Sequence, residues 1–186
     1  MPSTVPFGSA IRWVESIHPQ RLGLVQRPFG GERLEPEISY WQASGVGSVI
    51  SLLEASEVDA FSLQDEGAVR ARYGLRFTWF PIPNGGVPPT TAAMQDLAAA
   101  LHQDLLQNLG VLIHCRAGIG RTGLVAACLL HRLGHSSATI FQGLSLARGF
   151  KVPDNPEQVQ WFMSYAKAVD FAPSHSPGNS ITVKLP

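Results

Sequence analysis

The apolar residues of the chain fall into short runs separated by longer segments of mixed polarity. Short apolar runs bounded by glycine, proline or polar residues are typical of β-strands. Such runs predict strands at 12–14, 21–25, 46–53, 75–80 and 111–114. We expect the first two, which are short and separated by a His-Pro pair, to be edge strands. The run at 46–53 is almost wholly apolar, which favours a buried parallel strand.

The segments between these runs have helical character. We predict helices at 36–43, 63–73, 88–108, 122–133, 137–147 and 156–169. The segment 122–133 is apolar almost all round, which predicts that this helix is buried at the centre of the fold. Asn155 and Pro156 supply an N-cap and a first-turn proline to the last helix. Ser136 or Ser137 is expected to cap the helix before it.

Strands that alternate with helices predict an α/β fold with a central, mostly parallel sheet flanked by helices. Ligands of such folds sit beyond the carboxyl ends of the strands. The segment after His114 leaves such an end. The loops after Leu53 and Phe80 are expected to border the same crevice.

Length and composition indicate one domain. The chain has 186 residues, of which 45% are hydrophobic and 15% charged, so it can bury a sizeable core. We expect residues 1–171 to form this domain, as a monomer. Residues 172–186 are rich in proline, serine and glycine, which is typical of a flexible tail.

The charge pattern argues against several classes of partner. The formal net charge is 0 and the pI is about 7.0, which does not suggest nucleic acid or an anionic membrane as a partner. No apolar run approaches the ~18 residues that a membrane-spanning helix needs. The N-terminus lacks the features of a signal peptide. Two cysteines are too few for a secreted disulfide scaffold, so we expect a reducing, cytoplasmic setting.

One stretch carries most of the chemistry: residues 114–123 read His-Cys-Arg-Ala-Gly-Ile-Gly-Arg-Thr-Gly. The N–H groups of a glycine-containing loop can cradle an anion, and the N-terminus of the following helix adds free donors and a partial positive charge. This field favours the nucleophilic thiolate of Cys115. Arg121 can hold two phosphate oxygens at once. Thr122 can donate to the sulfur when the thiolate has to leave.

This stretch resembles the signature loop of the cysteine-dependent protein phosphatases, in which His-Cys is followed by five residues and then by Arg-Ser/Thr. A sulfurtransferase loop typically has one residue fewer, and the Gly-Lys-Ser/Thr of a Walker loop is absent. A structural loop around a buried free cysteine remains the alternative. With Trp13-Val14 and the segment 80–88, the chain is similar to the atypical dual-specificity phosphatases from about Trp13 to Ala168.

The resemblance implies a phosphatase without metal or cofactor that acts on phosphorylated protein, on phosphotyrosine and also on phosphoserine or phosphothreonine. Cys115 would attack phosphorus and form a phosphocysteine, while Arg121 and the loop amides hold the equatorial oxygens. Thr122 would then help the thiolate to depart as water hydrolyses this intermediate. The remaining loop residues would surround the phosphate: Arg116, Ala117, Gly118, Ile119 and Gly120, with His114 ordering the loop.

The chain departs from the family at the general acid. The family segment Pro-Ile-Pro-x-Gly-Gly normally carries an aspartate where this chain has Asn84, and an amide cannot give up a proton at useful pH. Three interpretations stay open. Another carboxylate substitutes, with Asp154 as the candidate and with Glu54, Glu57 and Asp59 also within reach of the crevice. Alternatively the enzyme is slow and prefers activated phosphates, or the chain is a substrate trap or an inactive phosphate-binding module.

Other residues have simpler interpretations. Cys128 lies in an apolar helical run and is expected in the core. Gly118 and Gly120 are expected to permit a positive φ or a close backbone approach. Arg148 is expected to be structural. The histidines other than His114 show no metal-ligand spacing, so no metal is expected.

Overall fold

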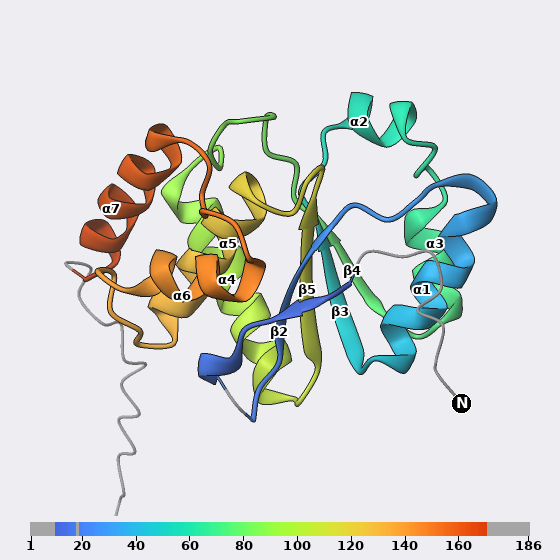
Figure 1. Ribbon diagram of the computed structural model, residues 1–186, viewed down its shortest axis with the longest axis horizontal. Coiled ribbons are helices and arrows are strands. Elements are labelled where there is room, and N and C mark those ends of the chain that lie inside the picture. Colours follow the sequence, from blue (N-terminus) through green and yellow to red (C-terminus); the bar gives the residue numbers. More distant parts are fainter. Residues whose placement is uncertain (1–9, 18, 171–186) are drawn as a thin grey trace, which may run out of the picture.

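The computed structural model describes residues 10–17 and 19–170, and the expected tail at 172–186 lies outside this range. The α/β fold with a central sheet flanked by helices is confirmed (Figure 1). The strands are β1 Arg12–Trp13, β2 Leu22–Gln26, β3 Val46–Ser51, β4 Arg76–Trp79 and β5 Gly110–Cys115. The α-helices are α1 Leu34–Ala43, α2 Ala55–Ala60, α3 Glu66–Arg72, α4 Thr91–Leu106, α5 Gly120–Arg132, α6 Ile140–Arg148 and α7 Pro156–Asp170. Two 3-10 turns, Glu15–Ile17 and Gly31–Arg33, flank β2.

The five strands are ordered β1-β2-β5-β3-β4, and only the β1–β2 pair is antiparallel. β5 is therefore the central strand, and all six of its residues are buried. The expectation that the second strand is an edge strand was wrong, because β2 pairs with both β1 and β5. Its parallel pairing brings Gln26 opposite Cys115, so the segments after β2 and β5 leave the sheet side by side.

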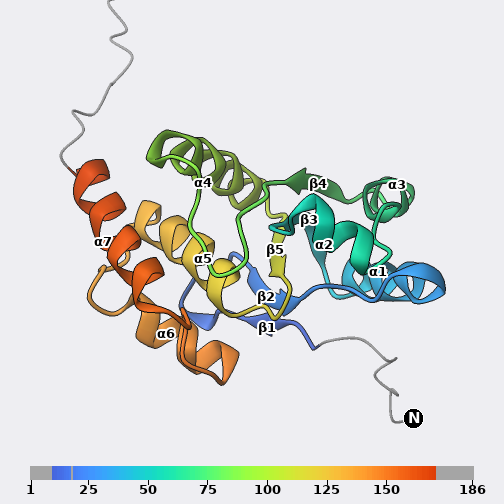
Figure 2. The same cartoon turned by 90° about the horizontal axis from the view of Figure 1, so that it is seen from above.

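Helices cover both faces of the sheet. α1 and α3 lie on one face, whereas α4, α5, α6 and α7 lie on the other (Figures 1 and 2). α5 is the central helix of the second layer, as predicted: residues 120–130 are all buried, and it packs against α4, α6, α7, β5 and β2. Two apolar clusters fill the spaces on either side of the sheet. Within the described residues, no helix is long and apolar enough to cross a membrane.

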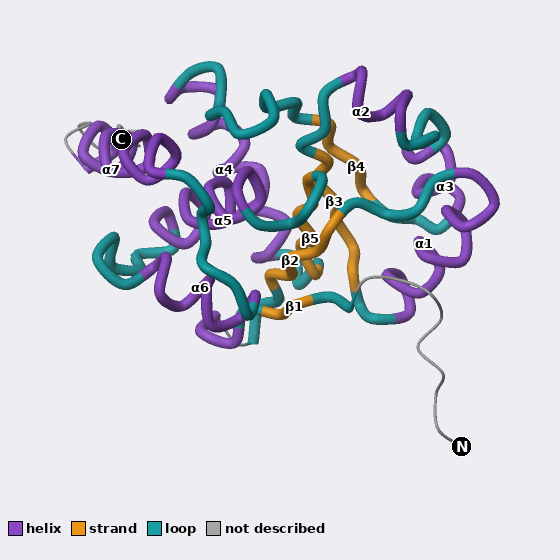
Figure 3. The backbone as a smooth tube through the Cα atoms, turned by 45° about the horizontal axis from the view of Figure 1, so that its top comes forward, coloured by secondary structure: helices purple, strands orange, loops and turns teal. Residues whose placement is uncertain are grey.

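The sequence did not predict α2, which lies above the carboxyl ends of the strands (Figures 1 and 3). This helix has no buried residue, so it shows none of the apolar periodicity that marks a packed helix. A capping box stabilises its start: the side chains of Glu54 and Glu57 each accept a backbone N–H of the other. Neither Ser136 nor Ser137 caps α6, whose N-cap position is Thr139.

The glycine at position 123 is required by packing. A Cβ there would lie 1.9 Å from Cγ1 of Val152, whereas a Cβ at Gly143 in α6 would meet nothing within 4 Å. We therefore expect Gly123→Ala to lower the free energy of unfolding by about 1–3 kcal/mol through overpacking. Gly143→Ala, the matched control, should raise it by about 0.4–1 kcal/mol because the unfolded chain loses freedom. Urea denaturation measures both, and equal effects would contradict this account of the packing.

Candidate active site

The signature stretch connects the central strand to the central helix. Cys115 is the last residue of β5, and α5 begins at Gly120. The loop between them forms part of the wall of a cavity of about 410 Å³ at the carboxyl edge of the sheet. The cavity is lined by Asn84, Gly85, Cys115, Arg116, Ala117, Gly120, Arg121, Asp154, Asn155 and Gln158. Cys115 is 3% exposed, is not in a disulfide and lines this cavity.

The loop is held by its carbonyl oxygens. The Arg148 side chain donates to the carbonyls of Ala117 (2.8 Å) and Gly118 (2.9 Å), and the Arg27 N–H donates to the carbonyl of Arg116 (3.4 Å). In a trans peptide the C=O and the following N–H point in opposite directions. Tying these three carbonyls outward therefore turns the next three N–H groups, those of residues 117–119, toward the inside of the loop. This arrangement is an anion nest.

Two glycines allow this path. Gly118 has φ +69°, and a Cβ there would lie 2.3 Å from the carbonyl oxygen of Val25. A Cβ on Gly120 would lie 2.5 Å from an Asp154 carboxylate oxygen. The positive φ and the close approach expected of these positions are thus both present. Because Gly120 has no Cβ, Asp154 in the segment before α7 can approach the start of α5 closely.

Arg121 is buried and held by five acceptors. Its two terminal nitrogens form a bidentate pair with the Glu57 carboxylate at 2.6 and 2.8 Å. Nη1 also donates to the carbonyls of Leu52 and Ile82, and Nη2 donates to Oδ1 of Asn84 at 3.2 Å. Although burial opposes charge, the bonds with Glu57 raise the pKa of Arg121, so the guanidinium stays charged.

A buried ionic network lies directly behind the loop. Glu66 pairs with Arg70, one turn along α3, and accepts from Nε2 of His114 at 3.0 Å. All three side chains are at most 3% exposed. Burial lowers the pKa of His114 despite the neighbouring carboxylate, so its imidazole is neutral at neutral pH. The network fixes His114, and with it the backbone that carries Cys115.

The segment with Asn84 is clamped over the cavity. The Asn84 N–H donates to the Glu54 carboxylate at 3.0 Å. The side-chain amides of Asn155 and Gln158 donate to the carbonyls of Gly85 (2.8 Å) and Gly86 (2.9 Å). The Asn155 side chain also accepts the Gln158 N–H, so it is the N-cap predicted for α7. The cavity roof is therefore bonded to the start of the last helix.

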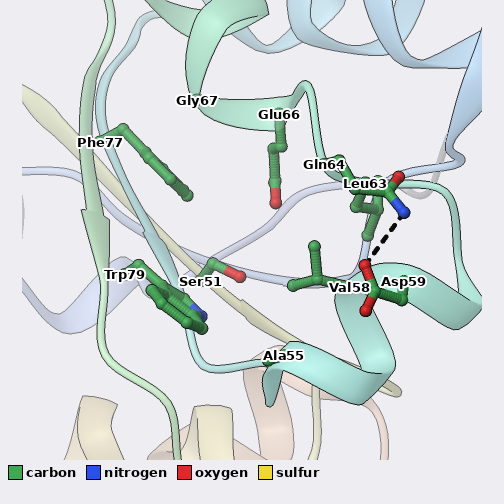
Figure 4. Close-up of a pocket in the computed structure, with 10 residues that line it drawn as sticks. All are labelled: Ser51, Ala55, Val58, Asp59, Leu63, Gln64, Glu66, Gly67, Phe77 and Trp79. Atoms are coloured by element: carbon green, nitrogen blue, oxygen red, sulfur yellow. Dashed lines mark hydrogen bonds between the residues drawn. The ribbon is translucent and has the colours of Figure 1, made fainter.

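The structure separates the four carboxylates that the sequence offered as substitute acids. Asp154 alone among them lines the cavity. Glu57 is paired with Arg121, and although burial opposes it, this bond lowers the pKa of Glu57, so it holds no proton to give. Glu54 binds the Asn84 backbone. Asp59 lies elsewhere, in a cavity of about 260 Å³ between α2, α3 and β4, where it accepts from Gln64 (Figure 4).

The remaining sequence candidates also have defined positions. Arg116 and Ala117 are exposed at the cavity wall, and Ile119 is the residue before α5. Thr122 is buried in the first turn of α5, and its hydroxyl has no hydrogen-bond partner within the described residues. Cys128 is buried in the core, and burial raises the pKa of its thiol well above the ordinary value.

Two contributors were missed from the sequence: Glu66, which comes from a segment that follows β3, and Gln158, which comes from α7. Gln158 Oε1 is buried, without a partner in the described part of the chain, and its residue lines the cavity. Glu57 was placed at the crevice from the sequence, as a candidate acid, because it follows a parallel strand that ends at the same edge as β5; its pairing with Arg121 was not foreseen. No sequence signal linked Glu66 or Gln158 to the loop.

Comparison with known proteins agrees with this geometry. A family model described as "Swiss Army Knife protein, DSP-PTPase phosphatase domain" matches residues 11–178. Cyclin-dependent kinase inhibitor 3 of Rattus norvegicus is 34% identical over 98 residues, which are 51% of this chain and 44% of that protein. The protein of the same name from Sus scrofa is 33% identical over 89 residues, 48% of this chain and 42% of that one. The matched region is thus less than half the length of these relatives.

Solved structures show the same fold. Kinase associated phosphatase, in a form whose catalytic-site cysteine is replaced by serine, superposes with a TM-score of 0.81 at 21% identity, covering 89% of this chain and 98% of that chain. The active form of Tk-PTP superposes with a TM-score of 0.69 at 20% identity, covering 84% and 96%.

The buried network generates a prediction about acid stability. The pKa of Glu66 is lowered from its ordinary value of 4.5, because His114 and Arg70 outweigh the burial that opposes its charge. A carboxylate with a lowered folded-state pKa stabilises the fold above its unfolded pKa, and that contribution is lost as the pH falls through the folded value. We expect the neutral, buried His114 to make the free energy of unfolding fall below about pH 6.5. The loss of the Glu66 contribution should steepen this fall below about pH 4.5, and Glu66→Gln should remove that steepening.

Glu66→Gln should also cost about 3–5 kcal/mol at neutral pH, since it leaves Arg70 buried without its charge partner. The matched control is Glu35→Gln, whose exposed pair with Arg72 should contribute about 0–1 kcal/mol. Chemical denaturation across pH measures both. An acid dependence equally steep in Glu66→Gln and in the unchanged chain would contradict the role given to the network.

Proposed function

We propose, on the premise that this chain belongs to the Swiss Army Knife family of DSP-PTPase phosphatase domains, that it hydrolyses phosphate monoesters on proteins. The observation that carries the proposal is the position of Cys115, which is buried and lines a cavity whose wall also includes the anion nest and the charged Arg121. Phosphotyrosine is the proposed substrate, with phosphoserine and phosphothreonine as further ones. The proposed partner is a phosphorylated protein, as the kinase-related names of the relatives suggest.

The first step forms a sulfur–phosphorus bond. The Cys115 thiolate attacks phosphorus, the bond from phosphorus to the leaving oxygen breaks, and that oxygen takes a proton from an acid. The loop N–H groups and Arg121 hold the three equatorial oxygens as their charge changes. Arg121 offers Nε and Nη2 for a bidentate contact, in which a phosphate oxygen replaces Oδ1 of Asn84 on Nη2.

Glu57 positions Arg121 for this step. Because its carboxylate grips both terminal nitrogens, the guanidinium plane is fixed before substrate arrives. Preorganisation of this kind removes the cost of orienting the charge during the reaction. Glu57 is thus a positioning residue rather than the acid.

Asp154 is the proposed acid for the leaving oxygen. It is the carboxylate that lines the cavity, and Gly120 allows it to approach the loop closely. Asn84 keeps the position of the family aspartate and bonds Arg121, but its amide has no proton to transfer. In this proposal, Asn84 bonds Arg121 at the cavity mouth, and Asp154 donates the proton.

The second step hydrolyses the phosphocysteine. Water attacks phosphorus, gives up a proton to the carboxylate that acted as acid, and the sulfur leaves as a thiolate. Gln158 is placed to orient this water, because its buried Oε1 has no partner in the described residues and its side chain lines the cavity. The unpartnered hydroxyl of Thr122 is available to donate to the departing sulfur. The thiolate requires a reducing setting, which we propose to be the cytoplasm, with the chain acting as a monomer.

The pH dependence of turnover tests this assignment. With para-nitrophenyl phosphate as substrate and Cys115→Ser as the blank, we expect a bell-shaped profile, because an acid must be protonated and a nucleophile ionised. Asp154→Asn should remove the decline at high pH. It should also lower kcat/KM on a phosphoserine peptide by about 10² to 10⁴, since a poor leaving group needs the proton most.

The matched control is Asp96→Asn, an exposed aspartate on α4 outside the cavity, which should keep the full profile. Asn84→Asp should raise activity on the same peptide by restoring a carboxylate at the family position. If Asp154→Asn behaves as Asp96→Asn does, the acid assignment is wrong. If the unchanged chain equals Cys115→Ser at every pH, the chain is a phosphate-binding module instead.

A further inference from the structure

A second hollow lies beside the signature loop, on the side away from α7. It measures about 350 Å³ and is formed where the segment after β2 meets the turn between α2 and α3. Its lining residues are Arg27, Phe29, Gly30, Gly31, Arg33, Ala60, Phe61 and Ser62. We call this hollow the arginine pocket. It shares no lining residue with the cavity that holds Cys115.

Three guanidinium groups gather on two aromatic rings here. Arg27 lies over the Phe61 ring at 3.9 Å from its centroid, and Arg116 lies over the same ring at 5.7 Å. Arg33 lies over the Phe29 ring at 5.5 Å. These distances are within the range of cation–π contacts, which orient a guanidinium without using its N–H donors. Nη1 of Arg27 donates to the carbonyl of Pro28 at 3.0 Å, which leaves the other N–H donors of Arg27 to an anion.

The pocket is electropositive. Arg27 and Arg116 lie over the same Phe61 ring, so two like charges are close together there. Burial, and then the charge of Arg116, lower the pKa of Arg27. Glu37 is the acidic residue that faces Arg27 and partly offsets this effect. Among described residues, the arginine–carboxylate ion pairs involve Arg70, Arg72, Arg76 and Arg121 instead. Positive charge without a bonded carboxylate is what a phosphoryl group requires.

The pocket is also built in advance of binding. The Phe29 N–H donates to Glu37 at 2.7 Å, and the Gly31 N–H donates to the carbonyl of Ser62 at 3.2 Å. Gly30 packs so closely on the opposite turn that a Cβ would lie 2.0 Å from the carbonyl oxygen of Phe61. The two segments that form the pocket are therefore locked together.

Arg116 connects the arginine pocket to the proposed catalytic cavity. It lines that cavity and stacks on Phe61 of the pocket. The backbone N–H of Arg27 donates to its carbonyl at 3.4 Å. An anion in the pocket and a phosphate above Cys115 would thus be neighbours on either side of one side chain.

We propose that the arginine pocket binds a second phosphoryl group of the substrate, so that the preferred substrate is a protein segment phosphorylated on two nearby residues. This inference rests on the proposed function. Guanidinium groups bind phosphoryl oxygens through charge-assisted, bidentate contacts. The two hollows share no lining residue, and Arg116 lies between them. Two phosphates bound there would therefore lie on two residues of a peptide rather than on adjacent positions of one sugar or inositol ring.

The test measures peptide affinity for the Cys115→Ser variant, which binds without turnover. A peptide with one phosphotyrosine is compared with peptides that carry an added phosphoserine at each flanking position in turn. We expect at least one doubly phosphorylated peptide to bind about tenfold or more tightly. When Arg27→Ala and Arg33→Ala are added to the Cys115→Ser variant, the affinity for that doubly phosphorylated peptide should fall to the affinity for the singly phosphorylated one. Arg132→Ala, at the far end of α5, is the matched control and should keep the preference.

The proposal is overturned if no added phosphoserine strengthens binding, or if the preference survives the loss of both arginines. It is also overturned if a soluble inositol bisphosphate binds more tightly than every doubly phosphorylated peptide and depends on the same arginines. The unchanged chain is assayed for turnover of the same peptides. If none is hydrolysed while the preference in binding remains, the proposed phosphatase function fails and the second phosphate site stands.

Discussion

The turn from β5 into α5 has to keep peptide carbonyls out of the cavity, and much of the surrounding structure serves that constraint. A carbonyl oxygen facing a bound phosphate would repel it, whereas an N–H attracts it. Arg148 and the N–H of Arg27 hold three successive carbonyls outward, and Gly118 supplies the positive φ that the path requires. The nest therefore exists because residues from α6 and from the end of β2 satisfy the outer side of the loop.

Charge is fixed around this turn in two layers. Near the cavity, Glu57 orients Arg121, which stays charged and ready for a phosphate. Behind it, Glu66 and Arg70 neutralise each other in the core and hold His114. Each buried charge has a partner, as the cost of burying an isolated charge demands. Cys115 directly follows His114 and lines the same cavity as Arg121, so its neighbours are fixed before any substrate arrives.

The alternation of strands and helices, the central position of α5 and the family were predictable from sequence, and each is confirmed. Apolar periodicity and the spacing of His-Cys and Arg-Thr carry that information. The helix α2 was missed because it buries no residue, so no apolar pattern marks it. Glu66, Gln158, the pairing of Glu57 with Arg121 and the arginine pocket were missed because their partners are distant in sequence and meet only in the fold. Arg27, for example, reaches the signature loop because β2 pairs with β5.

The phosphocysteine on Cys115 is the central claim, and rapid-quench mass spectrometry during turnover of para-nitrophenyl phosphate tests it most directly. The account predicts a transient gain of one phosphoryl group on the peptide that contains Cys115, formed with a burst of para-nitrophenol and absent from Cys115→Ser. Steady turnover with neither a burst nor an adduct, or an adduct on another residue, would contradict it.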